Sequence, residues 1–524
     1  MVESFFIKFR ETLWNWPYLL GRVLRKTAPI SYILISLIFV LISIYILYIS
    51  NFFNLSLFEG STYTEGIVAS STSYNPYAST NLNLVNDINH LIFSRLATVL
   101  PNGNVQKDLI SSWQSLNNAT EYIINLKKNI YFQNGKNMTS ADVIYSFNFM
   151  KDNFPSPSLN NISIYALSKY KIEFKLQSTD VTFFSDIDFN IVPAGSNYLS
   201  VDISHIIGSG PYSIAYITKN EIVLNSFDKY YKGSPYFKNF IIKIYNDNAD
   251  LVNALETGSV DGAYFDMYPN INISKYPNIS IYTKSMSSNY TALFFNLNNV
   301  TDIKLRNALS YSVNRKQLIQ KELSGEAVPV YGPIPQDSWA YDNSSSVDRY
   351  HYDIKQAKSD VTSLGTKITI YCESSIPYNV IRYLKKSWSK IGINANFIIV
   401  SNKNLEKIII DGKYQAVLVN IKGSIDPNSF DLWYSKSQGN LSHLNNSQID
   451  QLLVIGATTP NIESRKETYA LFQQQLMSID PAVFLYSNNF VYFVNNKIKG
   501  INFSKLTAPF QRYQSVENWE YNNQ

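Results

Sequence analysis

The stretch that decides the fold class is residues 368–400, ITIYCESSIPYNVIRYLKKSWSKIGINANFIIV. Its first apolar residues alternate as in a half-buried strand, and those of its middle recur at helical spacing. Gly392 ends the helix, and residues 393–400 predict a second strand. A strand, a helix and a strand form a β-α-β unit, so the sequence predicts an α/β fold whose sheets are covered by helices. The strand residues are Ile368, Ile370 and Cys372, and the helix residues are Val380, Leu384 and Trp388.

The segments on both sides of this unit also alternate between strands and helices. Alternating apolar residues predict a strand at 122–126, and Thr139 with Asp142 three residues later predicts the start of a helix. Asp302 favours the N-terminus of another helix, because the helix dipole stabilises an acidic side chain there. We expect further helices over residues 87–100, 249–255, 448–453 and 463–477.

The length and composition are those of a large folded protein. A chain of 524 residues predicts about two to four domains. The charged fraction is 16% and the hydrophobic fraction 45%, with 39 Tyr and 30 Phe, which allows a sizeable core and argues against disorder. The net charge of +5 is diluted over the chain, so we expect no nucleic-acid partner. One cysteine, Cys372, permits no intramolecular disulfide.

Residues 29–50, PISYILISLIFVLISIYILYIS, are long and apolar enough to span a membrane as a helix. Five basic residues precede this stretch, and the next basic residue after it is Arg95, so the N-terminus is expected in the cytoplasm. We therefore predict a cytoplasmic segment at 1–28, a single-pass anchor at 29–50, a linker at 51–64 and an extracytoplasmic remainder. The preceding basic residues are Lys8, Arg10, Arg22, Arg25 and Lys26.

The alternatives to a membrane anchor are a cleaved signal peptide and a lipid attached to cysteine. A cleaved signal peptide requires a shorter apolar core and a site of small residues, whereas bulky residues follow Ser50. A lipid anchor on cysteine does not fit, because Cys372 lies far along the chain. The aromatic and basic residues of 1–28 suit either a helix at the membrane surface or a disordered tail.

Catalytic and metal-binding motifs are missing from the sequence. The chain has no Gly-x-Ser-x-Gly elbow, no phosphate-binding Gly-x-x-x-x-Gly-Lys motif and no pair of histidines at metal-ligand spacing. We therefore expect no enzyme activity, no catalytic or metal-binding residues and no cofactor. The histidines are His90, His205, His351 and His443.

Several motifs in a fixed order resemble family 5 extracellular solute-binding proteins, the peptide-binding and nickel-binding components of ABC importers. The resemblance covers about residues 65–503. Its strength lies in the order of the motifs rather than in any one of them. They are Asn75-Pro76, Trp113, YIINLKKNIYF at 122–132, Asn134-Gly135, Thr139 to Val143, Gly208-Ser-Gly210-Pro211-Tyr212, NSFDKYYKG at 225–233, ALETGSVDGAYF at 254–265, and FFNLNN at 294–299 followed by Asp302 to Leu309.

The resemblance implies a type II periplasmic-binding-protein fold of two lobes with an extra domain. It implies an extended oligopeptide or similar organic solute held between the lobes, and an ABC permease as partner. The runner-up functions are a metal-chelate binder and an anchored structural or chaperone-like protein without transport. The implied boundaries are 65–98, 205–287 and 485–524 for lobe 1, the last with the C-terminal tail, 99–204 for the extra domain and 288–484 for lobe 2.

The resemblance also implies where the ligand binds. An extended ligand would pair with one segment at 79–83 and with another at 420–424, through main-chain hydrogen bonds. Peptide-binding relatives carry an aspartate three residues before the Asp-Pro of the second segment, and Gly423 stands there in this chain. Either another acid replaces it, Asp426 being the nearest, or the ligand has no free amine and Lys422 favours an anionic group. The implied ligand-binding residues are Thr80, Leu82, Tyr290, Asn296, Ile421, Lys422, Gly423 and Asp426.

Overall fold

The computed structural model describes residues 61–77, 82–199, 205–265, 269, 271, 275–285, 289–344, 349–423, 426–503 and 508–522. The predicted membrane span and the segment before it lie outside these residues. No helix within the described ranges has both the length and the apolar character needed to cross a bilayer. The folded body begins with a strand at Ser61, four residues before Glu65, where the sequence predicts its start.

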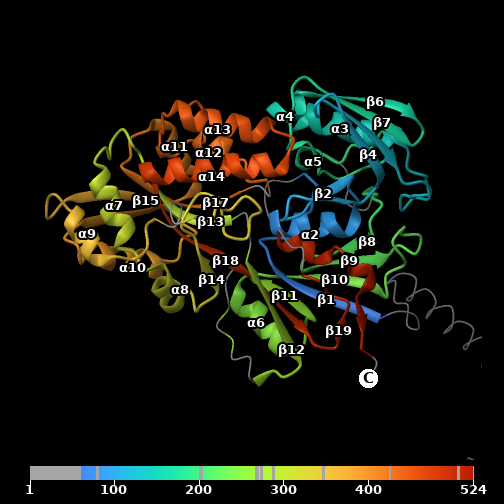
Figure 1. The fold of residues 1–524 in the computed structure, drawn as a ribbon. Helices are drawn as coiled ribbons and strands as arrows, with labels where there is room; N and C mark the ends of the chain where they lie inside the picture. Colours follow the sequence, from blue (N-terminus) through green and yellow to red (C-terminus); the bar gives the residue numbers. More distant parts are fainter. Residues whose placement is uncertain are drawn as a thin grey trace, which may run out of the picture. The chain divides into compact units, whose positions relative to one another are not determined.

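Twelve strands of the described ranges form one large sheet, in the order β16-β15-β17-β13-β18-β11-β1-β10-β9-β8, with β12 and β14 also paired to β18 (Figure 1). The strands are β1 (Ser61–Val68), β8 (Tyr212–Ile217), β9 (Glu221–Ser226), β10 (Phe237–Tyr245), β11 (Gly262–Phe265), β12 (Ile279–Ser285), β13 (Asn289–Phe295), β14 (Ala327–Pro329), β15 (Lys367–Glu373), β16 (Asn394–Val400), β17 (Ala416–Lys422) and β18 (Ala482–Asn495).

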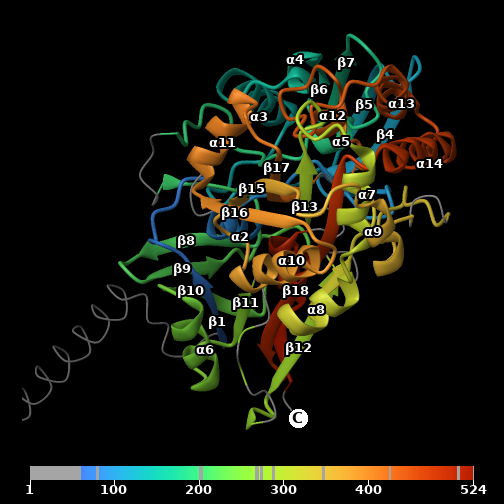
Figure 2. The same ribbon diagram turned by 90° about the vertical axis from the view of Figure 1, so that its left-hand side faces the viewer.

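The long strand β18 joins two halves of this sheet. Its first part pairs with β13 and β14, and its second part pairs with β11 and β12. We call β1 and β8–β12 the first half of the sheet and β13–β17 the second half. Both views of the ribbon show β18 running between the two sets of strands (Figure 2). A single strand therefore connects the two halves.

The β-α-β unit predicted from residues 368–400 is confirmed in the second half. Strands β15 and β16 pair in parallel from Lys367 and Asn394 onward, and α10 (Tyr378–Ser389) connects them. Trp388 of α10 is fully buried, and its indole Nε1 donates to the Leu309 carbonyl at 3.1 Å. The apolar face of the helix thus closes the core over the sheet.

Helices cover both halves of the sheet. Asp302 accepts from the backbone N–H of Lys304 at 2.9 Å and begins α7, as the sequence predicts. The helices at 249–255, 448–453 and 463–477 are also confirmed, with somewhat longer bounds. The first half carries α2 (Leu82–Ile92) and α6 (Asn248–Glu256), and the second carries α7 (Ile303–Tyr311), α8 (Arg315–Glu322), α9 (Ile354–Asp360), α11 (Asn402–Asp411), α12 (Phe430–Trp433), α13 (Ser447–Thr458) and α14 (Ile462–Ile479).

The helix predicted over 87–100 is wrong in its bounds. Helix α2 ends at Ile92, and residues 97–99 form a strand instead. The Ile92 carbonyl accepts from the backbone N–H of Gly210 at 2.7 Å, so a distant segment takes an acceptor at the end of the helix. A β-carbon on Gly210 would lie 2.6 Å from the Ile92 carbonyl carbon, so only glycine allows this approach.

Residues 97–191 contain a separate, smaller sheet in the order β4-β5-β7-β6. The predicted strand at 122–126 is confirmed as β5, whose side chains alternate between buried and half-buried. Helix α3 begins after Thr139, whose backbone N–H donates to the Asp142 carboxylate at 2.8 Å, as the sequence predicts. The elements here are β2 (Ala97–Val99), β3 (Val105–Lys107), β4 (Ile110–Leu116), β5 (Glu121–Leu126), β6 (Ile162–Ser168), β7 (Lys171–Leu176), α3 (Ser140–Asn153), α4 (Pro157–Asn160) and α5 (Phe183–Asp186).

The C-terminal segment returns to the first half and places a fully buried Arg512 there. Its guanidinium donates to Glu65 of β1 at 2.8 Å and to Asp87 of α2 at 2.5 Å. The Tyr63 and Tyr492 hydroxyls donate to the other Glu65 oxygen, each at 2.8 Å. This ion network ties the end of the chain to its beginning. The last elements are β19 (Ile498–Lys499), η3 (Pro509–Tyr513), η4 (Val516–Asn518) and β20 (Glu520–Tyr521).

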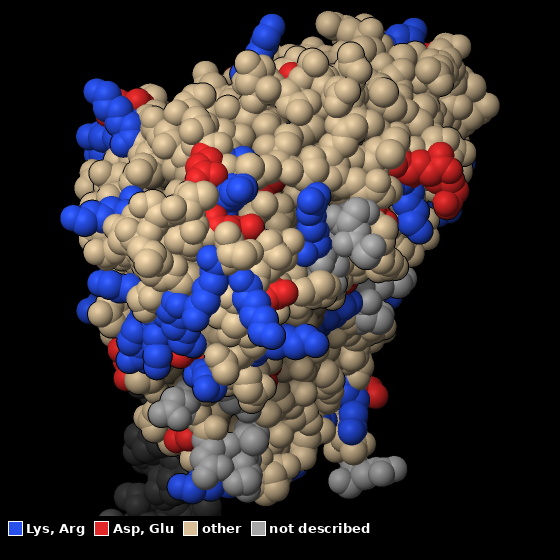
Figure 3. All heavy atoms as spheres, turned by 60° about the vertical axis from the view of Figure 1, so that its left-hand side comes forward, with Lys and Arg blue, Asp and Glu red and all other residues tan. Residues whose placement is uncertain are grey.

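Positive charge gathers on one face of the protein rather than being diluted over it. Figure 3 shows Lys and Arg side chains grouped on the side that carries the second half of the sheet. Helix α10 and the residue after it contribute four exposed basic residues and no acidic one. This local group of basic side chains stands on a protein whose net charge of +5 is small for its length. The four residues are Arg382, Lys385, Lys386 and Lys390, the last immediately after the helix.

Candidate functional site

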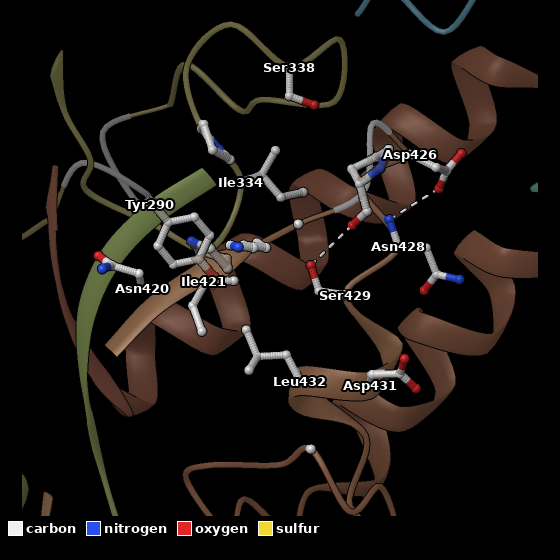
Figure 4. A pocket seen from close by; sticks show the side chains of 16 residues that line it. Tyr290, Ile334, Ser338, Asn420, Ile421, Asp426, Asn428, Ser429, Asp431 and Leu432 are labelled. Atoms are coloured by element: carbon white, nitrogen blue, oxygen red, sulfur yellow. Dashed lines mark hydrogen bonds between the residues drawn. The ribbon is translucent and has the colours of Figure 1, made fainter. Parts of the chain in front are cut away.

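A cavity of about 440 Å³ lies at the carboxyl end of β17. Its walls come from β13, from β17, from the loop at 333–338 and from the loop and short helix at 426–432 (Figure 4). The buried ring of Tyr290 and the buried side chain of Ile334 supply apolar surface. Amide and hydroxyl groups come from Asn420, Asn428, Ser429 and Ser338, and charged groups come from Lys422, Asp426 and Asp431.

The pairing of β17 explains why the cavity lies where it does. On one side β17 pairs with β13 through its whole length, as far as Lys422 opposite Asn289. On the other side it pairs with β15 only as far as Leu418, opposite Cys372. The last residues of β17 therefore extend beyond the end of β15, and they line the cavity.

Asn420 is fixed by hydrogen bonds from three directions. Its side-chain oxygen accepts from the Thr291 hydroxyl at 2.6 Å, and its side-chain amide donates to the Ser375 Oγ at 3.0 Å. Its backbone N–H donates to the Glu373 carboxylate at 2.9 Å. These bonds hold the end of β17 in one position at the cavity wall.

A buried ion pair forms another part of the wall. Both carboxylate oxygens of Asp426 accept from Arg465 Nη2, at 2.7 and 2.8 Å. The guanidinium also donates from Nε to the Gly456 carbonyl and lies 5.1 Å from the ring centroid of Trp339. Burial raises the pKa of the Asp426 carboxyl, and the charge of Arg465 offsets only part of that effect. Asp426 is thus already paired within the protein.

The smaller sheet and its loops approach the second half beside this ion pair. The backbone N–H of Val181 donates to the Ala457 carbonyl of α13 at 3.4 Å. The charge of Asp180 contributes to the raised pKa of Asp426, after burial. Gly103 lies against Trp339 and Ile462. A β-carbon added at Gly103 would lie 2.9 Å from the Ile462 side chain. Two parts of the fold that are distant in sequence therefore meet near the cavity.

The structure brings together five of the eight residues that the sequence proposes for ligand binding. Asn296 lies elsewhere: it follows the opposite end of β13, and its side-chain amide donates to the Gly412 carbonyl at 3.0 Å. Thr80 lies outside the described residues, and Leu82 is the first residue of α2. The five that line the cavity are Tyr290, Ile421, Lys422, Gly423 and Asp426.

Sequence reasoning missed the two loops that complete the cavity. Pro333 and Pro335 flank Ile334, a pattern that indicates a stiff, extended segment. Nothing in the sequence places that segment beside β17, since about 85 residues separate them. Asn428 and Ser429 follow the predicted Asp426 directly, and their position could have been inferred from it.

Comparison with known families identifies the chain. Residues 104–442, well over half of its length, match the family described as "Bacterial extracellular solute-binding proteins, family 5 Middle". The chain belongs to family 5 of the extracellular solute-binding proteins. The match contains the whole second half of the sheet and all the described residues that line the cavity. Strand β18, which joins the two halves, lies outside the match.

Individual relatives agree with this assignment. The probable D,D-dipeptide-binding periplasmic protein DdpA of Escherichia coli is 26% identical over 443 residues, 77% of this chain and 83% of its own. The solved structure of the oligopeptide-binding protein AppA of Bacillus subtilis, in complex with a nonapeptide, has a TM-score of 0.71 at 20% identity, over 88% of this chain and 100% of its own. The substrate-binding protein CtaP of Listeria monocytogenes has a TM-score of 0.79 at 21% identity, over 89% of this chain and 100% of its own. The two structures share the fold.

Proposed function

We propose that this chain is the membrane-tethered solute-binding component of an ABC importer, and that it captures an extended oligopeptide or similar organic solute outside the cell. The observation that carries the proposal is the cavity at the end of β17, where the strand continues beyond its neighbour β15. A strand with a free edge binds an extended chain through main-chain hydrogen bonds. The named binding functions of DdpA and AppA support a peptide as the solute class.

The side chains of the cavity suit binding of varied solutes. Tyr290 and Ile334 offer apolar contact area, and the amide groups of Asn420 and Asn428 can either donate or accept. Such groups bind an extended backbone without selecting one side chain at each position. The family consists of solute-binding proteins, so we propose that the solute is bound and not transformed.

At the positions that the sequence singles out, the cavity offers no free carboxylate to the terminal amine of a peptide; the other carboxylate of the described lining is that of the exposed Asp431 in α12. Gly423 provides no carboxylate, and the carboxylate of Asp426 is paired with Arg465 at 2.7 Å. Pairing the ammonium with Asp426 would require Arg465 to give up a buried ion pair, which is strongly unfavourable. We therefore propose a solute without a free amine at this position, with the exposed Lys422 favouring a neutral or anionic group there.

The membrane anchor is part of the proposal and rests on residues 29–50 and the basic residues before them. We expect a reporter fused after Gln524 to be accessible outside the cell. The mature protein should retain its original N-terminus. A mature form that begins after Ser50 would show that the apolar stretch is a signal peptide.

Ligand-dependent stabilisation of the full chain tests the binding function. A solute at a hundred times its Kd should stabilise the protein by about 2.7 kcal/mol, because it binds only the folded state. We expect peptide pools to raise the melting temperature, and sugars and metal chelates to leave it unchanged. A shift with metal chelates alone would favour the runner-up class. No shift with any pool would favour an anchored structural or chaperone-like protein.

A further inference from the structure

The edge of β17 beside the cavity is capped by a side chain. Strand β15 ends at Glu373, and the chain turns away over the next two residues. In a parallel pair, the next backbone carbonyl of β15 would have accepted from the N–H of Asn420. The Glu373 carboxylate accepts that hydrogen bond instead, at 2.9 Å. The side chain thus continues the ladder one step beyond the end of its own strand.

The Glu373 carboxylate is held firmly in this position. Its second oxygen accepts from the Ser375 hydroxyl at 2.7 Å, and Ser375 Oγ in turn accepts from the Asn420 side-chain amide at 3.0 Å. A hydrogen bond between an ionised carboxylate and a backbone N–H is about twice as strong as one between neutral groups. A neutral carbonyl of a bound solute could not replace the carboxylate without a loss of binding energy.

We propose that Glu373 determines where an extended solute begins to pair with β17. This inference rests on the proposed function. Backbone groups that face one edge of a strand recur at every second residue, so Lys422 is the next residue after Asn420 to face this edge. With Asn420 occupied by Glu373, pairing starts at Lys422, and the solute stops short of β15. Glu373 is therefore a positioning residue that limits how far the solute extends along the strand.

A matched pair of variants tests this role. Glu373→Ala exposes the backbone N–H of Asn420, whereas Glu373→Gln keeps a carbonyl acceptor at the same place. Calorimetric titrations would use the full chain in detergent and a ladder of alanine peptides, from the dipeptide to the nonapeptide. We expect peptides one residue longer than the wild-type optimum to bind Glu373→Ala about threefold to tenfold more tightly than the wild type, as for one added main-chain hydrogen bond. Glu373→Gln should keep the wild-type length profile.

Hydrogen exchange supplies a second measurement. The expected change is confined to one amide, whereas a loss of folding would speed exchange throughout the protein. Without peptide, the amide of Asn420 should exchange slowly in the wild type and in Glu373→Gln, and rapidly in Glu373→Ala. The control is Glu406→Ala, which removes an exposed carboxylate from α11 and should change neither the exchange nor the profile.

The outcomes separate the inference from the proposed function. If the wild type binds the ladder and Glu373→Ala keeps its length profile, Glu373 is only a strand cap and the inference is overturned. A wild type that binds no member of the ladder would count against peptide binding itself, and the inference would fall with it.

Discussion

Two buried arginines, one packed with each half of the sheet, form ion pairs with carboxylates, but the two clusters have different roles. Arg512 in the first half is fully buried and is shared by two carboxylates, Glu65 and Asp87. Arg465 in the second half is 6% exposed and pairs with a single carboxylate, Asp426, which also lines the cavity. The first cluster is surrounded by protein, and the second has the cavity on one side.

The difference shows what each ion pair can do. Around Arg512, tyrosine hydroxyls and the second carboxylate leave no room for a ligand, so the cluster joins β1, α2 and the C-terminal segment. Around Arg465, the pairing withdraws Asp426 from the solute and fixes the loop that forms the wall. A buried carboxylate beside a cavity is therefore not in itself a ligand-binding group.

The largest effect is expected from Arg512→Met. Removing the cation leaves two buried carboxylates without a compensating charge, which should cost about 3–5 kcal/mol of the free energy of unfolding. Urea unfolding of the full chain in detergent measures this. Arg382→Met removes an exposed arginine, whose side chain is 67% exposed, and should change stability by less than about 0.5 kcal/mol. Equal losses in the two variants would contradict the structural role of the Arg512 cluster.

A smaller loss, with a change in binding, is expected from Arg465→Met. One carboxylate loses its partner, so we expect about 2–3 kcal/mol of destabilisation. The wall of the cavity is disturbed as well, so solute affinity should fall, whereas the folded fraction of Arg512→Met should bind as the wild type does. Calorimetric titration of both variants makes the comparison. Loss of affinity in both would remove the distinction between the two clusters.

Gly423→Asp adds a carboxylate to the cavity wall. Unlike the carboxylate of Asp426, the new one is not paired with Arg465. A peptide with a free amine should then bind about tenfold more tightly than its acetylated form, about 1.4 kcal/mol, whereas the wild type should bind the two forms about equally. The same peptide in both forms, titrated against both proteins, tests this. A wild type that already prefers the free amine tenfold must use another acid.

The pH dependence of stability tests the Arg512 cluster separately. Burial raises the pKa of Asp87 to about 6, and Arg512 lowers it only in part. The folded carboxyl therefore keeps its proton to a higher pH than the unfolded one, and its contribution to stability is lost as pH rises from about 4 to about 6. Relative to Asp87→Asn, the wild type should lose about 3 kcal/mol across that range, since each pKa unit is worth about 1.4 kcal/mol. Melting curves of both proteins at a series of pH values measure this. If the stability of the two proteins changes with pH in the same way, Asp87 is not the group responsible.

The sequence predicted the elements whose signals are local. Helix α10, the start of α3 at Thr139 and the strand β5 depend on spacing and on neighbouring residues, and all three are present. The end of α2 at Ile92 depends on Gly210, which no local pattern reveals. The lobe boundaries and the ligand-binding role of the cavity residues stay predictions.

The candidate site shows the same contrast between residues that the sequence can identify and residues that only the fold brings together. Ile421, Lys422 and Gly423 were named because the resemblance implies a ligand-pairing segment at 420–424, and the structure places all three in the cavity wall. Arg465 was missed, because only the folded chain brings it to Asp426, 39 residues away. Asn296 was proposed from a motif, but its amide serves the turn at Gly412.

The central claim is that an extended solute pairs with the exposed edge of β17. Hydrogen exchange of the full chain, with and without the peptide pool that raises its melting temperature most, measures it directly. Slower exchange at the amide of Lys422, with no change in α10, is the predicted result, because a new main-chain hydrogen bond protects the amide that faces the exposed edge of the strand. A peptide pool that stabilises the protein but leaves the exchange of Lys422 unchanged would contradict the claim and place the binding site elsewhere.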